Sequence, residues 1–354
     1  MSPEAGVHYP VCLKGKGACP PEDVGGVWGY AGFLEAISDP NNSEHDEYLE
    51  WVGGEFDPDE FDLQEVNEQL RQIGRGRSAQ AQNTWSVEQG EPTEKKFAQA
   101  ASWSQTLPDD QQAVAENLPL RSDTITLLTY LRDNKVTGTT STGNLPLKAA
   151  HEICARFDNP PILEEVIGEY VFKIRSESDV WPLYFRHLLA SVLGLVAGGP
   201  GRRWRLTPFG ERFLGAPAPL QVWLLSATWW TQINWAVASP LGYEDGFMPD
   251  GFSRLVLKQL LDLPEGQPEA FEPFADRIIE EARLSWPVYD QESGRRTLRV
   301  IIENIVIDPL INFGVLQAEY ETHKRLGEGF RELGEFQLTS FGKGLLRSME
   351  QILS

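Results

Sequence analysis

The sequence predicts a mainly α-helical protein with short β-hairpins, built from two winged-helix-like modules behind a small, incomplete α+β N-terminal segment. An internal repeat is the first reason, because Leu206-Thr207-Pro208-Phe209-Gly210 returns as Leu338-Thr339-Ser340-Phe341-Gly342. The second is the order of patterns before each copy, namely amphipathic helices, a Gly-containing turn and a hairpin, which is the order expected of a winged helix. The third is length, since 354 residues exceed what one hydrophobic core usually supports.

Residues 1–73 form an acidic segment that is rich in turns and short helices. It contains sixteen Asp or Glu against three Lys or Arg. Helices are predicted over about 30–37 and after two capping boxes, Ser43-Glu44-His45-Asp46 and Asp62-Leu63-Gln64-Glu65. Apolar residues recur at helical spacing after each predicted helix start, so we expect short helices joined by loops.

Short motifs of this segment follow one another in a fixed order and spacing: Tyr9-Pro10-Val11-Cys12, Ala18-Cys19-Pro20-Pro21-Glu22-Asp23-Val24-Gly25-Gly26, Tyr30 with Phe33-Leu34, Asp39-Pro40, Glu44-His45, Trp51-Val52-Gly53-Gly54, Phe56-Asp57-Pro58, and Phe61-Asp62 with Val66-Asn67. Over about residues 5–73 this series resembles the Ri-plasmid ORF-three-like family, whose members are also described as passenger proteins of an insertion element. The resemblance covers the C-terminal part of the family domain, so the strands that normally come first have no counterpart here. It implies a plasmid or mobile-element origin and an incomplete α+β fold, and it implies no catalytic residue.

Residues 74–118 are predicted to be a linker, because they are rich in Gly, Gln, Ala and Ser and lack sustained periodicity apart from a short helix at about 95–103. Residues 119–216 are predicted to form the first winged-helix-like module. Its helices are expected from about 123, at 146–157 and at 182–193, with a Thr-rich strand at 136–142, an insertion at 158–179 and wing strands at 195–197 and 204–207.

Residues 217–245 are predicted to contain a buried, Trp-rich helix that bridges the two modules. No charged residue occurs between Arg212 and Glu244, but Gln221, Gln232 and Asn234 argue against a membrane-spanning helix. Residues 246–354 are predicted to form the second module. Its helices are expected at 252–261, 271–285 and 298–313, followed by a longer hairpin with Gly327 and Gly329 at the tip.

The charge and the cysteine content limit the function and the compartment. A formal net charge of -21 repels a phosphate backbone at long range, so any nucleic-acid contact needs a local basic patch. Three cysteines cannot build a disulfide framework, and the first four residues lack the features of a signal peptide. We therefore predict a cytoplasmic protein without a membrane segment.

Three arginines around Trp204 give the sharpest functional indication. Arg202, Arg203 and Arg205 lie at the predicted wing, where they can reach phosphates or a minor groove, and Arg186 of the preceding helix completes a candidate nucleic-acid site. That helix leaves mainly Arg186, His187 and Ser191 to face outward, which is little for reading bases in a major groove. The alternative is a protein-binding winged helix whose arginines pair with the surplus carboxylates.

Cys12, Cys19 and His45 are candidate zinc ligands, with Asp23 or Asp46 as a fourth. The Cys-x6-Cys spacing is looser than in most structural zinc sites, so two small buried thiols bracing a loop are the alternative. A calcium loop beginning at residue 57 is disfavoured, because it lacks the Gly that the sharp turn requires.

No motif of a hydrolase, metalloprotease, nucleotide-binding protein or recombinase occurs in the sequence. We therefore predict a non-enzymatic interaction or scaffold protein without a cofactor, whose partner is an unknown protein. The alternative is a DNA-binding accessory protein or transcriptional regulator that uses the basic wing of the first module.

Overall fold

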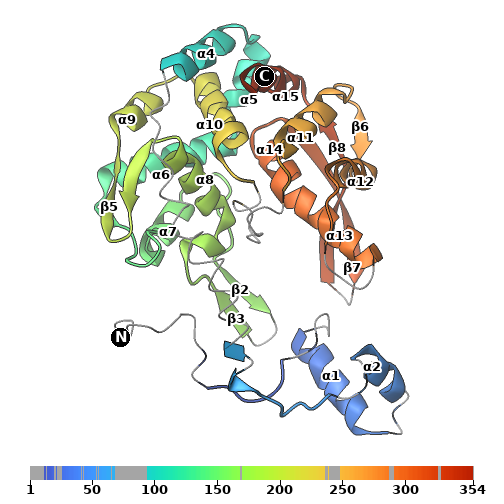
Figure 1. The fold of residues 1–354 in the computed structure, drawn as a ribbon. Helices are drawn as coiled ribbons and strands as arrows, with labels where there is room; N and C mark the ends of the chain where they lie inside the picture. Colours follow the sequence, from blue (N-terminus) through green and yellow to red (C-terminus); the bar gives the residue numbers. More distant parts are fainter. Residues whose placement is uncertain are drawn as a thin grey trace. The chain divides into compact units, whose positions relative to one another are not determined.

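The computed structural model describes residues 26–40, 44–52, 56–64, 94–167, 170–235, 248–286, 291–325 and 328–353, with 12, 14–19, 21, 42, 54, 66–67 and 238. The chain divides into two compact units, Met1–Gln80 and Ala81–Ser354, here called the N-terminal and C-terminal units. The prediction of a mainly helical protein with short hairpins is confirmed, since small antiparallel sheets accompany the helices (Figure 1). Within the described residues, no helix is both long and apolar enough to span a bilayer.

The N-terminal unit is held together by an aromatic cluster. Helices α1 (Gly26–Ser38) and α2 (His45–Trp51) pack against each other. Phe33 is fully buried, and its ring lies 5.1 to 6.2 Å from the rings of Tyr30, Tyr48, Trp51 and Phe56. Four aromatic contacts to one side chain explain how so short a pair of helices buries a core.

The two predicted helix starts of this unit have different outcomes. Asp62 caps the second one, because its Oδ1 atom accepts a hydrogen bond from the N–H of Gln64 at 2.7 Å. Ser43 of the first capping box lies outside the described residues, and the Asn42 side chain accepts from the N–H of Glu44 instead.

The predicted linker overlaps two helices of the C-terminal unit. Helices α4 (Glu94–Gln105) and α5 (Asp109–Glu116) pack on α10 (Ala218–Gln232), and Ala100, Leu107 and Ala115 belong to the core. The helical part of this segment therefore extends well beyond the short helix that we predicted at 95–103. Small alanine side chains fill the contact of α4 and α5 with α10. Because large apolar residues are few there, the sequence gives only a weak helical pattern.

Two halves of the C-terminal unit repeat one order of elements: helix, short strand, helix, helix, hairpin and closing helix (Figure 1). The first half consists of α6 (Pro119–Asp133), β1 (Val136–Thr137), α7 (Leu147–Cys154), α8 (Trp181–Val192), β4 (Val196–Gly199), β5 (Arg202–Leu206) and α9 (Pro208–Leu214). The second half consists of α11 (Phe252–Leu261), β6 (Pro268–Ala270), α12 (Phe271–Ala282), α13 (Gln291–Ile302), a π-helical turn (Glu303–Ile307), α14 (Asp308–Asn312), β7 (Leu316–Arg325), β8 (Glu328–Leu338) and α15 (Ser340–Leu353). The insertion of the first half contains the hairpin β2 (Glu164–Ile167) and β3 (Tyr170–Lys173) and a 3-10 turn (Glu177–Asp179).

Each half contains an antiparallel sheet with the same strand order, β1-β5-β4 in one and β6-β8-β7 in the other. In both, the strand between the first two helices pairs with the second strand of the hairpin. The sequence pattern does not predict β6. The strand predicted at 136–142 is only β1, because the chain turns at Gly143, which has a φ of +82° and donates its N–H to Thr139.

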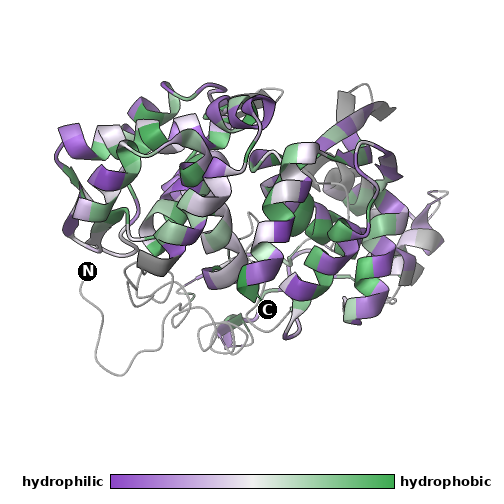
Figure 2. Cartoon of the chain, turned by 90° about the horizontal axis from the view of Figure 1, so that it is seen from above, coloured by the Kyte–Doolittle hydropathy of each residue, from purple (hydrophilic) through white to green (hydrophobic). Residues whose placement is uncertain are grey.

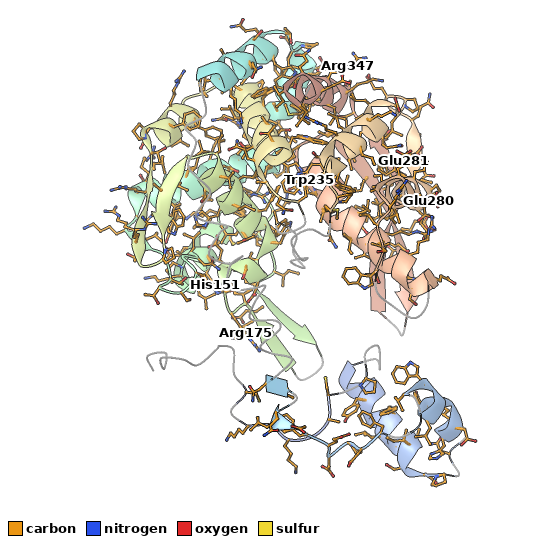
Figure 3. The ribbon with its side chains drawn as sticks, in the orientation of Figure 1. His151, Arg175, Trp235, Glu280, Glu281 and Arg347 are labelled. Atoms are coloured by element: carbon orange, nitrogen blue, oxygen red, sulfur yellow. The ribbon has the colours of Figure 1, made fainter. Side chains whose placement is uncertain are left out.

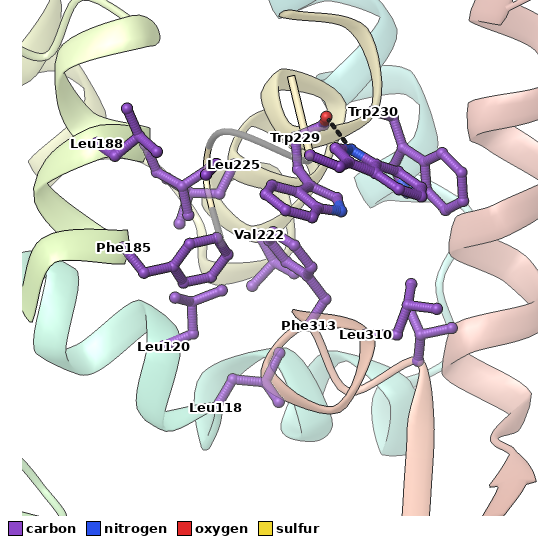
Figure 4. Close-up of a cluster of buried hydrophobic side chains, with 14 of the residues drawn as sticks. Leu118, Leu120, Phe185, Leu188, Val222, Leu225, Trp229, Trp230, Leu310 and Phe313 are labelled. Atoms are coloured by element: carbon purple, nitrogen blue, oxygen red, sulfur yellow. Dashed lines mark hydrogen bonds between the residues drawn. The ribbon is translucent and has the colours of Figure 1, made fainter. Parts of the chain in front are cut away.

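The Trp-rich helix α10 contacts both halves. It is buried from Ala218 to Trp230. The Trp229 ring meets Phe185 of α8 edge-on at 5.4 Å, and the Trp223 indole donates to the Ser348 hydroxyl of α15 at 3.0 Å. Figure 4 shows Val222, Leu225 and Trp229 clustered with Phe185 of the first half and Phe313 of the second. Many other helices present a hydrophilic side and an apolar side, as amphipathic helices around a core do (Figure 2).

Candidate functional site

Strand β5 carries the three arginines of the predicted wing. Side chains alternate along a strand, so Trp204 faces the core with 2% exposure while Arg203 and Arg205 point to the outer face. Arg202, at the start of the strand, is exposed as well. Among the described residues, these three side chains form no ion pair, so the alternative in which they pair with the chain's own carboxylates does not hold there.

Strand β1 extends this basic surface. Thr137 pairs with Arg203 in the sheet and is exposed, and Lys135 directly before the strand is exposed too. Arg132 lies nearby in sequence but pairs with Asp133 at 2.9 Å, so it adds no net charge. We call Lys135, Arg202, Arg203 and Arg205 the basic face.

A buried polar network fixes the inner side of β5. The Trp204 indole donates to the carbonyl oxygen of Gly143 at 2.8 Å, and its ring meets the ring of His187 edge-on at 4.3 Å. The Nδ1 atom of His187 lies 2.6 Å from a carboxylate oxygen of Glu177, whose other oxygen accepts from the N–H of Leu145 at 2.5 Å. Trp204 is thus held from the inside, and the arginines beside it are displayed from a rigid strand.

Arg186 is not part of this face. It is 4% exposed, and its Nη2 atom pairs with Asp123 of α6 at 2.8 Å. His187 and Ser191 are buried too, so our prediction that these three residues face outward is wrong. Helix α8 packs against α6, α10 and β4, which leaves no solvent-facing stripe. Burial raises the pKa of the Asp123 carboxyl, against the opposing effect of the Arg186 guanidinium.

Two arginines of the second half, Arg295 and Arg299, are paired with carboxylates, in contrast to the basic face. Arg295 and Arg299 of α13 both contact Asp276 of α12, at 2.9 and 2.8 Å. Arg295 also pairs with Glu280, which Figure 3 labels on the outer side of α12. Hydrogen bonds from Arg299 and Arg295 lower the pKa of Asp276 to about 2. These arginines connect two helices, so they offer little charge to a partner.

The candidate zinc ligands of the N-terminal unit do not form a metal-binding group. His45 Nδ1 lies 3.0 Å from the carbonyl oxygen of Ala36, and the backbone N–H of Cys12 donates to Asn67 at 2.7 Å. In the described part of the chain, no three His, Cys, Asp or Glu side chains lie together in a group that could hold a metal ion. Cys19 is exposed and Cys12 is half-buried, so the alternative of two buried thiols fails as well. Asp23 lies outside the described residues.

Comparison with known proteins concerns this same unit. Residues 1–65 match the family model described as plasmid pRiA4b ORF-3-like protein. One relative is the uncharacterized protein y4hQ of Sinorhizobium fredii, which is 53% identical over 51 residues, or 14% of this chain. The chain therefore covers only 26% of the length of that relative. No solved structure matches the sequence.

The ORF-3-like segment contains α1, α2 and the aromatic cluster around Phe33. The match supports the resemblance seen in the sequence. The C-terminal unit lies outside it, so its function rests on its own geometry.

Sequence patterns did not reveal two features of the C-terminal unit. Burial raises the pKa of Glu303 to about 7 and that of Asp308 to about 6, where α13 passes through the π-helical turn. A cavity of about 330 Å³ lies between the two halves and is lined by Asp123 and Asn312 among others. Residues so far apart in the chain leave no local signal of a shared site.

Proposed function

We propose that the C-terminal unit is a non-enzymatic scaffold, made of two winged-helix-like halves on one core, that binds a protein partner. The burial of α8 carries this proposal. A winged helix that reads DNA inserts its third helix into the major groove, whereas α8 is enclosed by α6, α10 and β4. A helix without a solvent-facing stripe cannot contact base edges.

The order of elements supports the winged-helix interpretation of both halves. In each sheet the strand that comes last in the chain, β5 or β8, lies between the other two. The repeated Leu-Thr-x-Phe-Gly motif joins that strand to the helix that follows it. In the second half, α13 and α14 occupy the place of the third helix. Leu298, Ile301 and Ile302 of α13 are buried, and Arg295 and Arg299 pair with carboxylates of α12, so these two arginines are not available for reading bases.

A plasmid or mobile-element origin is the second part of the proposal. It rests on the match of residues 1–65 and adds no activity. The expected partner is a protein of the same element or of its host.

Affinity capture of the full chain followed by nuclease treatment tests the scaffold proposal. The complex is expected to keep a fixed protein stoichiometry in light scattering after nuclease digestion. If the captured complex is lost on digestion, nucleic acid and not protein holds it together, and the proposal fails.

A DNA-binding accessory role is the second candidate, and the unpaired arginines of the basic face favour it. Four cations on one surface neutralise up to four phosphates, so log K should fall with log salt with a slope of about -3 to -4. The double variant Arg203→Ala/Arg205→Ala should reduce that slope by about 2. Arg296→Ala, whose side chain pairs with Glu292 on α13, is the matched control and should leave the slope unchanged. Absence of duplex binding at low salt would exclude this role.

A further inference from the structure

The cavity between the two halves has the size and position of a ligand site. Its volume of about 330 Å³ is at the lower end of the range of small-molecule pockets. Its lining includes Leu120 of α6 and Trp181 and Phe185 of α8 from the first half, and Ile311 and Asn312 of α14 from the second. A molecule held there would contact both halves at once.

The apolar wall is suited to a flat ring. The rings of Trp181 and Phe185 stack at 5.4 Å with an angle of 26° between their planes. Phe185 is buried, and its ring also contacts Trp229. Trp181 is only half-buried, and it lines the cavity. A half-buried indole offers a flat surface on which another aromatic ring can stack.

The polar groups of the cavity are neutral in sum. The buried pair Arg186–Asp123 contributes one charge of each sign, with 5% and 3% side-chain exposure. Among the described residues, the Nε atom of Arg186 has no hydrogen-bond partner, but this atom is itself fully buried and is not exposed to the cavity. Asn312 uses its Nδ2 atom on the carbonyl oxygen of Asp308, which leaves its Oδ1 atom as an acceptor.

We infer that this cavity binds a neutral, planar heteroaromatic ring of the nucleobase class. A charged ring would find no net counter-charge there, because the Arg186–Asp123 pair is neutral in sum. A nucleobase carries N–H donors for the Asn312 amide oxygen on one flat edge. Stacking on Trp181 supplies the apolar contact.

Occupancy of the cavity would link the two halves. Leu120, Trp181 and Asn312 lie on three different helices, so a bound ring adds contacts between α6, α8 and α14 that are absent without it. Binding to the folded state alone raises the melting temperature with the logarithm of the ligand concentration above the dissociation constant. A small molecule in this cavity would thereby regulate how firmly the two halves of the proposed scaffold hold together.

Titration calorimetry of the full chain with adenine, uracil and benzoate tests the inference. At least one base is expected to bind with a dissociation constant below about 1 mM, and benzoate, an anionic ring, more than tenfold more weakly. Trp181→Leu is expected to weaken the base about tenfold by removing the stack. Asn312→Leu should weaken it as well, and it serves as the second variant should Trp181→Leu fail to fold.

Gln351→Leu is the matched control, because Gln351 lines a different cavity of about 300 Å³ between α4, α10 and α15. It should leave the affinity unchanged. Three results would overturn the inference: no saturable binding of either base, benzoate binding as tightly as the better base, or loss of affinity in Gln351→Leu alone.

Discussion

The hydroxyl oxygen of Thr207 accepts a hydrogen bond from the backbone N–H of Gly210 at 3.0 Å and donates one to the carbonyl oxygen of Gly194 at 2.6 Å. Thr339 repeats both bonds, to Gly342 and Gly314, at 2.8 Å each. The threonine therefore caps the closing helix and fixes it to the start of the hairpin in each half. The repeated motif of the sequence is one structural joint that is used twice.

Substitution of the glycine in this joint should destabilise the protein. A Cβ atom at Gly210 would overlap the carbonyl oxygen of Leu195, and one at Gly342 that of Val315. Because both overlaps involve backbone, Gly210→Ala or Gly342→Ala should each cost roughly 1–3 kcal/mol in urea denaturation. Gly344→Ala is the control, since the nearest atom to its Cβ is 3.8 Å away. Alanine should raise stability there by about 0.5–1 kcal/mol, as expected in a helix. Equal changes in the free energy of unfolding at Gly210, Gly342 and Gly344 would contradict the proposed role of this joint.

This joint also shows why much of the fold can be predicted from sequence. Leu-Thr-x-Phe-Gly recurs because the strand-to-helix turn needs a capping hydroxyl and a residue without a side chain, so one local motif predicts both halves. The direction of Arg186 could not be predicted, because α8 is apolar on nearly all sides and its periodicity selects no outer face. A hairpin strand with Arg202, Arg203 and Arg205 around it was predicted and is present as β5, whereas the cavity depends on three helices that meet only in the folded chain.

Replacement of Glu303 should stabilise the protein at high pH. Its pKa, about 7, is raised by burial first and then by Asp308 and Glu332. A carboxyl whose folded pKa is raised is stabilising below its unfolded pKa, and that contribution is lost as pH rises from about 4.5 through 7. Glu303→Gln should therefore raise stability by about 1 kcal/mol at pH 8, since solvent screens part of the effect, and change little at pH 4. Glu335→Gln, which removes an exposed carboxylate of β8, is the control. A gain for Glu303→Gln that is equal at both pH values would contradict the mechanism.

Removal of one partner of the Arg186–Asp123 pair should cost more than removal of both charges. Arg186→Met leaves a buried carboxylate unpaired, which typically costs 3–5 kcal/mol. Asp123→Asn in the same chain removes that charge and keeps an acceptor for the N–H of Asp158, which Asp123 binds at 2.9 Å. The double variant should therefore be more stable than Arg186→Met in chemical denaturation. If the loss of stability in the double variant equals the sum of the losses in Arg186→Met and in Asp123→Asn, the two side chains are not coupled.

Truncation of Trp229 should lower the free energy of unfolding of both halves together. The side chain is fully buried and lies between Phe185 and Trp235. Trp229→Ala should cost about 3–5 kcal/mol by opening a cavity in the shared core. Denaturation followed by fluorescence and by circular dichroism should still give one coincident transition. Two separated transitions would show that the halves unfold independently and share no core.

Selection of duplexes from a random-sequence pool by the full chain tests the central claim most directly, namely that α8 is a structural helix inside a scaffold. Without a helix that reaches base edges, no motif should be enriched, and any binding through the basic face should be equal among sequences and fall steeply with salt. An enriched motif in which single-base changes alter affinity tenfold or more would contradict the claim, because such discrimination requires direct contacts with bases.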